Sequence, residues 1–75
     1  MERFIKIGDR YKHFKGHLYE VISIAKDCED LKEMVVYRNV ETGEEWVREK
    51  SEFLSEVDHE KYPEIKQKYR FEKIK

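Results

Sequence analysis

Short strand-like runs, whose side chains would alternate between two faces, constrain the fold of this chain more than any other feature. A turn signal bounds each run. The longest run spans residues 18–25, where apolar side chains fall at both odd and even positions. Successive side chains of a strand point to opposite faces of a sheet, so this run predicts a central strand that is covered on both sides. On one of its faces we expect Tyr19, Val21, Ser23 and Ala25.

Further runs complete the predicted sheet, at residues 10–13, 34–39, 46–48 and 69–74. Turns that contain glycine separate several of the runs, at residues 8–9, 15–16 and 41–44. Ser51 is a candidate N-cap for a single helical turn at 51–54. The sequence therefore predicts a mainly β fold of four to five strands. We expect the sheet to roll into a small, partly open barrel with one short helical turn.

The charge of the chain is nearly balanced overall but unevenly distributed. Its 16 basic and 17 acidic residues give a net charge of −1, and its 75 residues are enough for one domain, 1–75. Both ends are net basic, whereas residues 27–60 carry twelve acidic and four basic side chains. General nucleic-acid binding is disfavoured, because phosphate neutralisation requires a net basic domain. Oppositely charged surfaces that aid solubility or docking into a homo-oligomer are the favoured interpretation.

A single cysteine bears on the cellular compartment and on metal binding. Cys28 excludes an intramolecular disulfide and supplies no metal-ligand spacing, and its acidic neighbours disfavour a thiolate. The charged N-terminus does not resemble a signal peptide, and no run approaches the roughly 20 apolar residues that cross a bilayer. We therefore expect a cytoplasmic protein without membrane association, metal or cofactor.

Aromatic and cationic residues gather in three places and form the candidate binding surface. The three clusters lie in or beside strand-like runs, at residues 11–16, 35–38 and 45–48. Aromatic rings offer stacking surfaces, and Lys, Arg and His side chains contact anionic groups. The candidate ligand-binding residues are Tyr11, His13, Lys15, Tyr37, Arg38, Trp46 and Arg48.

Strand alternation limits which of these side chains can act together. Tyr37 and Arg38 are adjacent and must face opposite ways, whereas Trp46 and Arg48 share a face and form the better pair. Trp46 could instead pack in the core, with Arg48 paired to a nearby glutamate. His13 could donate to an anionic ligand or serve as a hydrogen-bonded structural residue. The sequence is compatible with either alternative in both cases.

Several motifs in order resemble the small bacterial and phage domain-of-unknown-function family sixteen fifty-three. These motifs are Tyr11–Gly16, Tyr19–Val21, Val35–Arg38, Trp46–Arg48 and Phe53–Leu54, and the resemblance covers about residues 8–57. It implies a compact, mostly β domain with an SH3-like or barrel-like shape, and it implies no established activity. The chain departs from the family pattern at Glu49, where proline is common, and in a charged C-terminal extension. We expect the extension to affect ligand choice or subunit contacts.

No spacing of side chains selects a catalytic acid, base or nucleophile, so we predict that the protein is not an enzyme. The first functional hypothesis is a noncatalytic module for a small anionic planar ligand, such as a nucleotide or a nucleotide-derived signal. If the source is a phage, such a module would act as a sequestering sponge. The alternative is an SH3-like protein- or peptide-interaction module, because such barrels offer aromatic grooves and exposed strand edges.

Overall fold

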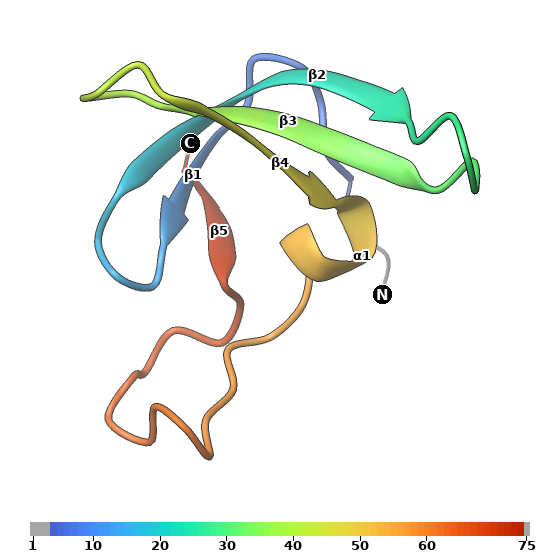
Figure 1. Cartoon of the computed structure of the whole chain (residues 1–75). Helices are drawn as coiled ribbons and strands as arrows, with labels where there is room; N and C mark the ends of the chain where they lie inside the picture. Colours follow the sequence, from blue (N-terminus) through green and yellow to red (C-terminus); the bar gives the residue numbers. More distant parts are fainter. Residues whose placement is uncertain (1–3, 75) are drawn as a thin grey trace.

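The computed structural model describes residues 4–74, which form five strands and one short helix (Figure 1). In chain order these are β1 (Arg10–His13), β2 (Leu18–Lys26), β3 (Glu33–Asn39), β4 (Glu45–Glu49), α1 (Lys50–Phe53) and β5 (Phe71–Ile74). Each predicted run corresponds to one observed strand. The last strand begins two residues later than predicted, because Tyr69 pairs with Glu56 in an isolated bridge that lies outside β5.

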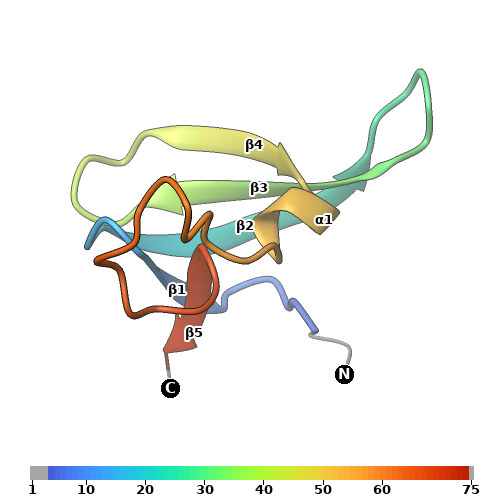
Figure 2. The ribbon, with the colours of Figure 1, turned by 90° about the horizontal axis from the view of Figure 1, so that it is seen from below.

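All five strands belong to one antiparallel sheet with the order β4-β3-β2-β1-β5. Strands β1 to β4 form a meander, and β5 returns from the end of the chain to pair with β1. The sheet curves strongly, but its edge strands β4 and β5 do not pair with each other (Figures 1 and 2). The predicted class is therefore confirmed: mainly β, a small SH3-like or partly open barrel of four to five strands with one short helical turn.

Strand β2 contains a bulge just after Val21, and the bulge changes which side chains face the core. Val21 is the partner of Tyr37 before the bulge, and Ile24 is the partner of Val35 after it. Tyr37 and Val35 are two residues apart and share a face, so Val21 and Ile24 share it as well. The alternation predicted for residues 19–25 is wrong beyond the bulge, because the extra residue reverses it.

The hydrophobic core covers the inner face of the curved sheet. Its buried members are Tyr11, Val21, Val35, Tyr37, Phe53 and Phe71. Phe53 and Phe71 stack with ring centroids 4.1 Å apart and an interplanar angle of 10°, and Tyr11 meets Phe53 edge-on at 5.1 Å. Four of the six buried side chains of this cluster are thus aromatic, and such rings bury a large area each.

Helix α1 follows β4 directly and is held by its packing rather than by a cap. It begins at Lys50, with Glu49 in the N-cap position and no side-chain cap hydrogen bond. The prediction of Ser51 as N-cap is wrong, because Ser51 lies inside the helix. A helix of four residues is not stable alone. The fully buried side chain of Phe53 anchors it to the core.

A turn-rich segment at residues 55–70 joins α1 to β5 and lies on the inner side of the sheet (Figure 2). Its ends are joined by backbone hydrogen bonds, from Val57 N–H to the Lys68 carbonyl at 2.9 Å and from Arg70 N–H to the Ser55 carbonyl at 3.0 Å. The side-chain amide of Gln67 also donates to the carbonyl oxygen of Lys12 in β1, at 3.0 Å. These bonds fix the segment against the rest of the domain.

Candidate functional site

A hollow of about 270 Å³ lies where the β1–β2 turn, β4 and the 55–70 segment meet. We call it the cationic pocket and define it by its lining residues, which are His13, Phe14, Lys15, Arg48, Asp58, Lys61, Tyr62 and Arg70. The fold thus collects side chains from both ends of the sequence at one place on the inner side of the sheet.

The β1–β2 turn presents His13, Phe14 and Lys15 to the cationic pocket. Gly16 closes the turn with a φ of +98°, and its N–H donates to the His13 carbonyl at 2.8 Å. The Lys15 N–H donates to Nδ1 of His13 at 3.1 Å. Because Nδ1 accepts this bond, we assign the proton of the neutral ring to Nε2, which is then a donor.

The 55–70 segment supplies the opposite wall of the cationic pocket. Asp58 organises this wall, since its carbonyl accepts the Tyr62 N–H at 2.9 Å and its Oδ1 accepts the Lys61 N–H at 3.3 Å. The Tyr62 ring packs against Phe14 with centroids 5.1 Å apart. Lys15 Nζ lies 5.9 Å from the Phe14 centroid and 5.8 Å from that of Tyr62. The two walls therefore meet through a pair of aromatic rings with a cation over both.

Positive charge dominates the cationic pocket. Four of its side chains are basic and one, Asp58, is acidic. Within residues 4–74, no ion pair with a carboxylate involves Lys15, Lys61 or Arg70. Arg70 Nε is buried and has no hydrogen-bond partner in this part of the chain. Leaving a buried donor unpaired costs about 1–3 kcal/mol, so an anionic acceptor that reached this atom would recover that energy.

Arg48 reaches the cationic pocket from β4, where it lies opposite Val35 on the inner face of the sheet. Its Nε donates to the Tyr37 hydroxyl at 3.4 Å, and its Nη1 lies 3.7 Å from the carboxylate of Glu52. A partly exposed pair near the surface contributes about 0–1 kcal/mol. A ligand anion can therefore compete with Glu52 for Arg48 at low energetic cost.

His13 is neutral at physiological pH. Its partial burial, followed by the charges of Lys15 and Arg48, lowers the pKa of His13 from 6.5 to about 4. The neutral ring packs against Phe14 with centroids 4.4 Å apart and against Phe71 at 4.9 Å. His13 therefore has the hydrogen-bonded structural role that was one of its two predicted alternatives, and its role towards an anionic ligand stays a prediction.

The structure brings together three of the seven predicted site residues: His13, Lys15 and Arg48. Tyr37 contacts this group only through the bond from Arg48 to its hydroxyl, because its ring is buried in the core. Tyr11 is 1% exposed and belongs to the core as well. Both tyrosines supply core area rather than a stacking surface.

Arg38 and Trp46 lie outside the cationic pocket. Arg38 is on the outer face, where Glu20 lies 3.9 Å from it and 3.4 Å from Arg10. Trp46 is on the inner face opposite Tyr37, as its predicted pairing with Arg48 requires, yet it is 50% exposed at the edge of the sheet. Trp46 is therefore neither a core residue nor a wall of the pocket.

Sequence reasoning did not identify the remaining pocket residues, which are Phe14, Asp58, Lys61, Tyr62 and Arg70. The available signal was the net basic charge of residues 61–75, with six basic and two acidic side chains. That signal does not tell which of these cations face the core side of the domain.

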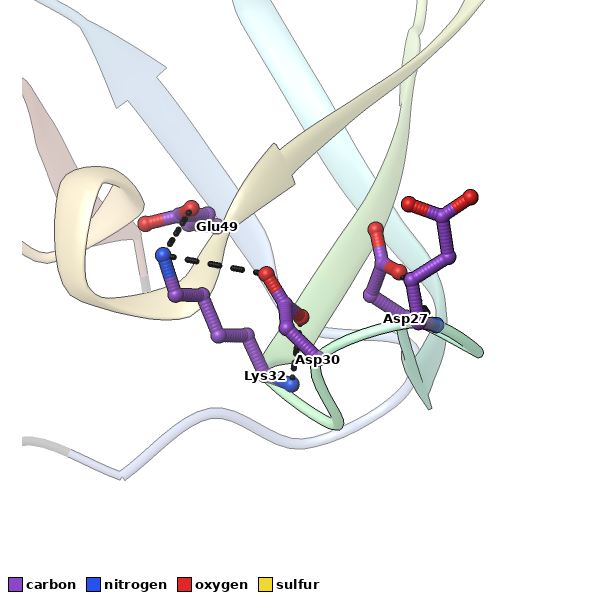
Figure 3. A network of polar contacts seen from close by, with 5 residues as sticks. Asp27, Asp30, Lys32 and Glu49 are labelled. Atoms are coloured by element: carbon purple, nitrogen blue, oxygen red, sulfur yellow. Dashed lines mark hydrogen bonds and ion pairs between the residues drawn. The ribbon is translucent and has the colours of Figure 1, made fainter.

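A larger hollow of about 650 Å³ between α1 and the β2–β3 turn is balanced in charge, with two lysines and two glutamates in its lining. Figure 3 shows Lys32 reaching Glu49 at 3.3 Å and Asp30 at 3.8 Å, and Lys50 pairs with Glu33 at 3.4 Å. The hydrogen bond with Glu49 is the main reason why the pKa of Lys32 is raised. Because its lysines are already paired, this hollow offers no uncompensated charge to a ligand.

Residues 4–74 contain neither a cluster of metal-binding side chains nor a membrane-spanning helix. No three or more His, Cys, Asp or Glu side chains are grouped so that they could hold a metal ion. No helix in the same range has the length and apolarity needed to span a membrane. The cationic pocket is therefore built from protein donors and aromatic rings, without an acidic metal-binding cluster.

This combination of a partly open barrel and a cationic pocket defines a small β domain, and comparison places it in a family. The chain matches the family described as "Protein of unknown function (DUF1653)" over residues 9–73, and it belongs to that family. The match extends beyond residues 8–57, so it includes most of the segment interpreted as a C-terminal extension. No curated protein and no solved structure matches the chain significantly.

Proposed function

We propose that the protein is a noncatalytic module that binds a small anionic planar ligand, such as a nucleotide or a nucleotide-derived signal, in the cationic pocket. The main support is the excess of cations there, since three of the four basic side chains form no ion pair within the described residues. Proteins rarely gather like charges without a counter-charge, because their mutual repulsion is unfavourable. A bound anion removes that repulsion.

The chemistry of the walls suggests a role for each part of such a ligand. Arg48 and Arg70 carry guanidinium groups that suit bidentate contacts with phosphate, and Arg70 Nε is the unpaired donor. The Nε2–H of neutral His13 adds a donor beside them. Phe14 and Tyr62 offer rings against which a planar base can pack, and Lys15 spans the space between the anion and these rings.

The volume of the cationic pocket limits how much of a ligand it can enclose. At about 270 Å³ it lies below the range of roughly 300–1,000 Å³ typical of sites that enclose a whole drug-sized ligand. A phosphate and the adjoining part of a nucleotide fit this size, whereas a large polyanion would remain mostly outside. If the source is a phage, a module that retains such a signal would act as a sponge.

The first test is to identify what the protein retains. Gentle purification followed by denaturation and mass spectrometry would name any small molecule that is released. Titration calorimetry would then compare adenosine 5′-monophosphate with adenosine and with inorganic phosphate. Binding of the monophosphate above both fragments supports a planar anionic ligand. Equal, weak responses to all three would contradict it.

A matched pair of lysine variants tests the location of the site. Lys15 lines the cationic pocket, whereas Lys12 is exposed on β1 and does not. A hydrogen bond to a charged group contributes about 1.5–3 kcal/mol, so Lys15→Gln should weaken binding of the monophosphate by about tenfold or more. Lys12→Gln changes the net charge equally and should bind like wild type. Equal losses in both variants would indicate a nonspecific charge effect and refute the site.

The predicted alternative, a protein- or peptide-interaction module, draws its support from the exposed Trp46 at the edge strand. Aromatic side chains of this kind are enriched at interaction hot spots. A specific macromolecular partner in a pull-down, together with no retained small molecule and no response to adenosine 5′-monophosphate, would favour this alternative over ligand binding.

A further inference from the structure

The outer edge of β4 is open to strand pairing. Among residues 4–74, β4 pairs only with β3, and it forms the upper rim of the sheet in Figure 2. The Asn39 N–H donates to the Glu44 carbonyl at 2.9 Å, which makes these residues a hydrogen-bonded pair. Such pairs alternate along an antiparallel ladder. The backbone groups of Trp46 and Arg48 therefore point to β3, whereas those of Glu45 and Val47 point outward.

Two large apolar side chains are exposed at this edge, between charged neighbours. Trp46 is 50% exposed on the inner face and Val47 is 60% exposed on the outer face. Natural edge strands are usually protected by lysine, proline or a bulge. The β3–β4 register continues without a shift, and residues 45–49 contain neither proline nor lysine. Neither a bulge nor a proline therefore prevents another strand from pairing with this edge, and Trp46 and Val47 offer it apolar contact area.

We propose that the occupant is a second copy of this chain, whose β4 pairs antiparallel with β4 of the first across a two-fold axis at Trp46. In this register Trp46 faces Trp46 of the partner subunit on the inner side, as a non-hydrogen-bonded pair. The outward backbone groups of Glu45 meet those of the partner's Val47, and the symmetric pair forms on the other side of the axis.

Charge complementarity selects this register over its neighbour. With the axis at Trp46, Glu44 lies opposite Arg48 of the partner subunit, and the reciprocal pair has the same opposite charges. With the axis at Val47, Glu45 would lie opposite the partner's Glu49 twice. Opposite charges across a strand pair are stabilising and like charges are destabilising. The inference uses the edge of the sheet and does not depend on the ligand proposed for the cationic pocket.

Disulfide trapping tests the register directly. In a Cys28→Ser background, Trp46→Cys places two thiols at a non-hydrogen-bonded pair, where Cα atoms lie about 4.5 Å apart and a disulfide can form. The matched control is Val47→Cys, because Val47 is at the same edge and similarly exposed. In the proposed register its two copies are about 8 Å apart, which is too far for a disulfide.

Oxidation of both variants at equal concentration, followed by non-reducing electrophoresis, separates the outcomes. We expect a covalent dimer to form rapidly for Trp46→Cys and at the rate of random collision for Val47→Cys. Rapid cross-linking of Val47→Cys alone would overturn the register. Slow cross-linking of both variants would overturn the interface. The same result is expected if a peptide of another protein, and not a second copy of this chain, occupies the edge.

Sedimentation equilibrium of the unmodified protein provides an independent test. We expect the mass to rise from monomer towards dimer with concentration. Val47→Lys should remove this rise, because it places a charge at the paired edge. The matched control, Val40→Lys, changes an exposed valine in the β3–β4 turn and should leave the rise intact. A monomer at all concentrations, or a dimer that persists in Val47→Lys, would overturn the proposal.

Discussion

Truncation of Phe53 is expected to remove a large share of the stability of this domain. Phe53 is fully buried and is the side chain that anchors α1, a helix without a side-chain cap hydrogen bond. It also stacks on Phe71 and touches Tyr11 and Tyr37. Phe53→Ala therefore deletes a ring at the centre of the aromatic core and releases α1 from the sheet.

The expected loss follows from the buried area and from the contacts. A buried Phe contributes about 150–250 Å², and replacing it with Ala typically costs about 3–5 kcal/mol. Stabilities of roughly 0.05–0.15 kcal/mol per residue give a domain of this length about 4–11 kcal/mol in total. We therefore expect Phe53→Ala to be only marginally folded, because a loss of about 3–5 kcal/mol is a large part of a total stability of about 4–11 kcal/mol.

Urea denaturation followed by circular dichroism provides the measurement. The midpoint should shift strongly while the slope stays that of wild type, because the same surface is exposed on unfolding. Phe4→Ala is the matched control, since Phe4 is 76% exposed and its truncation should change the free energy of unfolding by less than about 0.5 kcal/mol. A loss below about 1 kcal/mol for Phe53→Ala would refute the view that α1 is held by its packing.

Two further predictions concern the β1–β2 turn. Because the pKa of His13 is lowered to about 4 in the folded state, the unfolded chain takes up the proton first as pH falls. His13 should thus contribute a loss of stability between pH 6.5 and 4, and its ring signals in NMR should titrate near 4; a midpoint near 6.5 would contradict the burial. Gly16→Ala should lower the free energy of unfolding by about 1–2 kcal/mol in urea denaturation, because a Cβ at φ +98° is strained even though no atom lies within 4 Å of it. An unchanged midpoint would show that the turn can relax.

Strand positions were predictable from the sequence because each strand is bounded by a local signal. Glycine turns flank β1 and separate β3 from β4, and an acidic stretch at residues 27–32 separates β2 from β3. The bulge after Val21 was not predictable in the same way, since neither glycine nor proline occurs in residues 18–26. It arises from pairing with β3, which is a tertiary contact. One extra residue there was enough to reverse the predicted faces of the second half of β2.

The candidate site was only partly predictable, for two different physical reasons. Strand alternation already predicted that Tyr37 and Arg38 face opposite sides of the sheet. The structure places Tyr37 in the core and Arg38 on the outer face. The opposing wall depends on how the 55–70 segment folds back, which hydrogen bonds such as that from Gln67 to Lys12 determine. Contacts between positions so distant in sequence leave no periodic pattern in either segment.

Strand β4 carries both proposed interactions, and its geometry keeps them separate. The Arg48 side chain turns inward to the cationic pocket, whereas the backbone of Val47 turns outward to the free edge. Lys15 is on the β1–β2 turn, so its substitution should change ligand binding without changing the association state. Val47→Lys should do the reverse. Loss of both ligand binding and dimer formation in either variant would instead indicate that the pocket and the edge are coupled. Arg48 would be the link, because it faces the cationic pocket and is opposite Glu44 of the partner subunit.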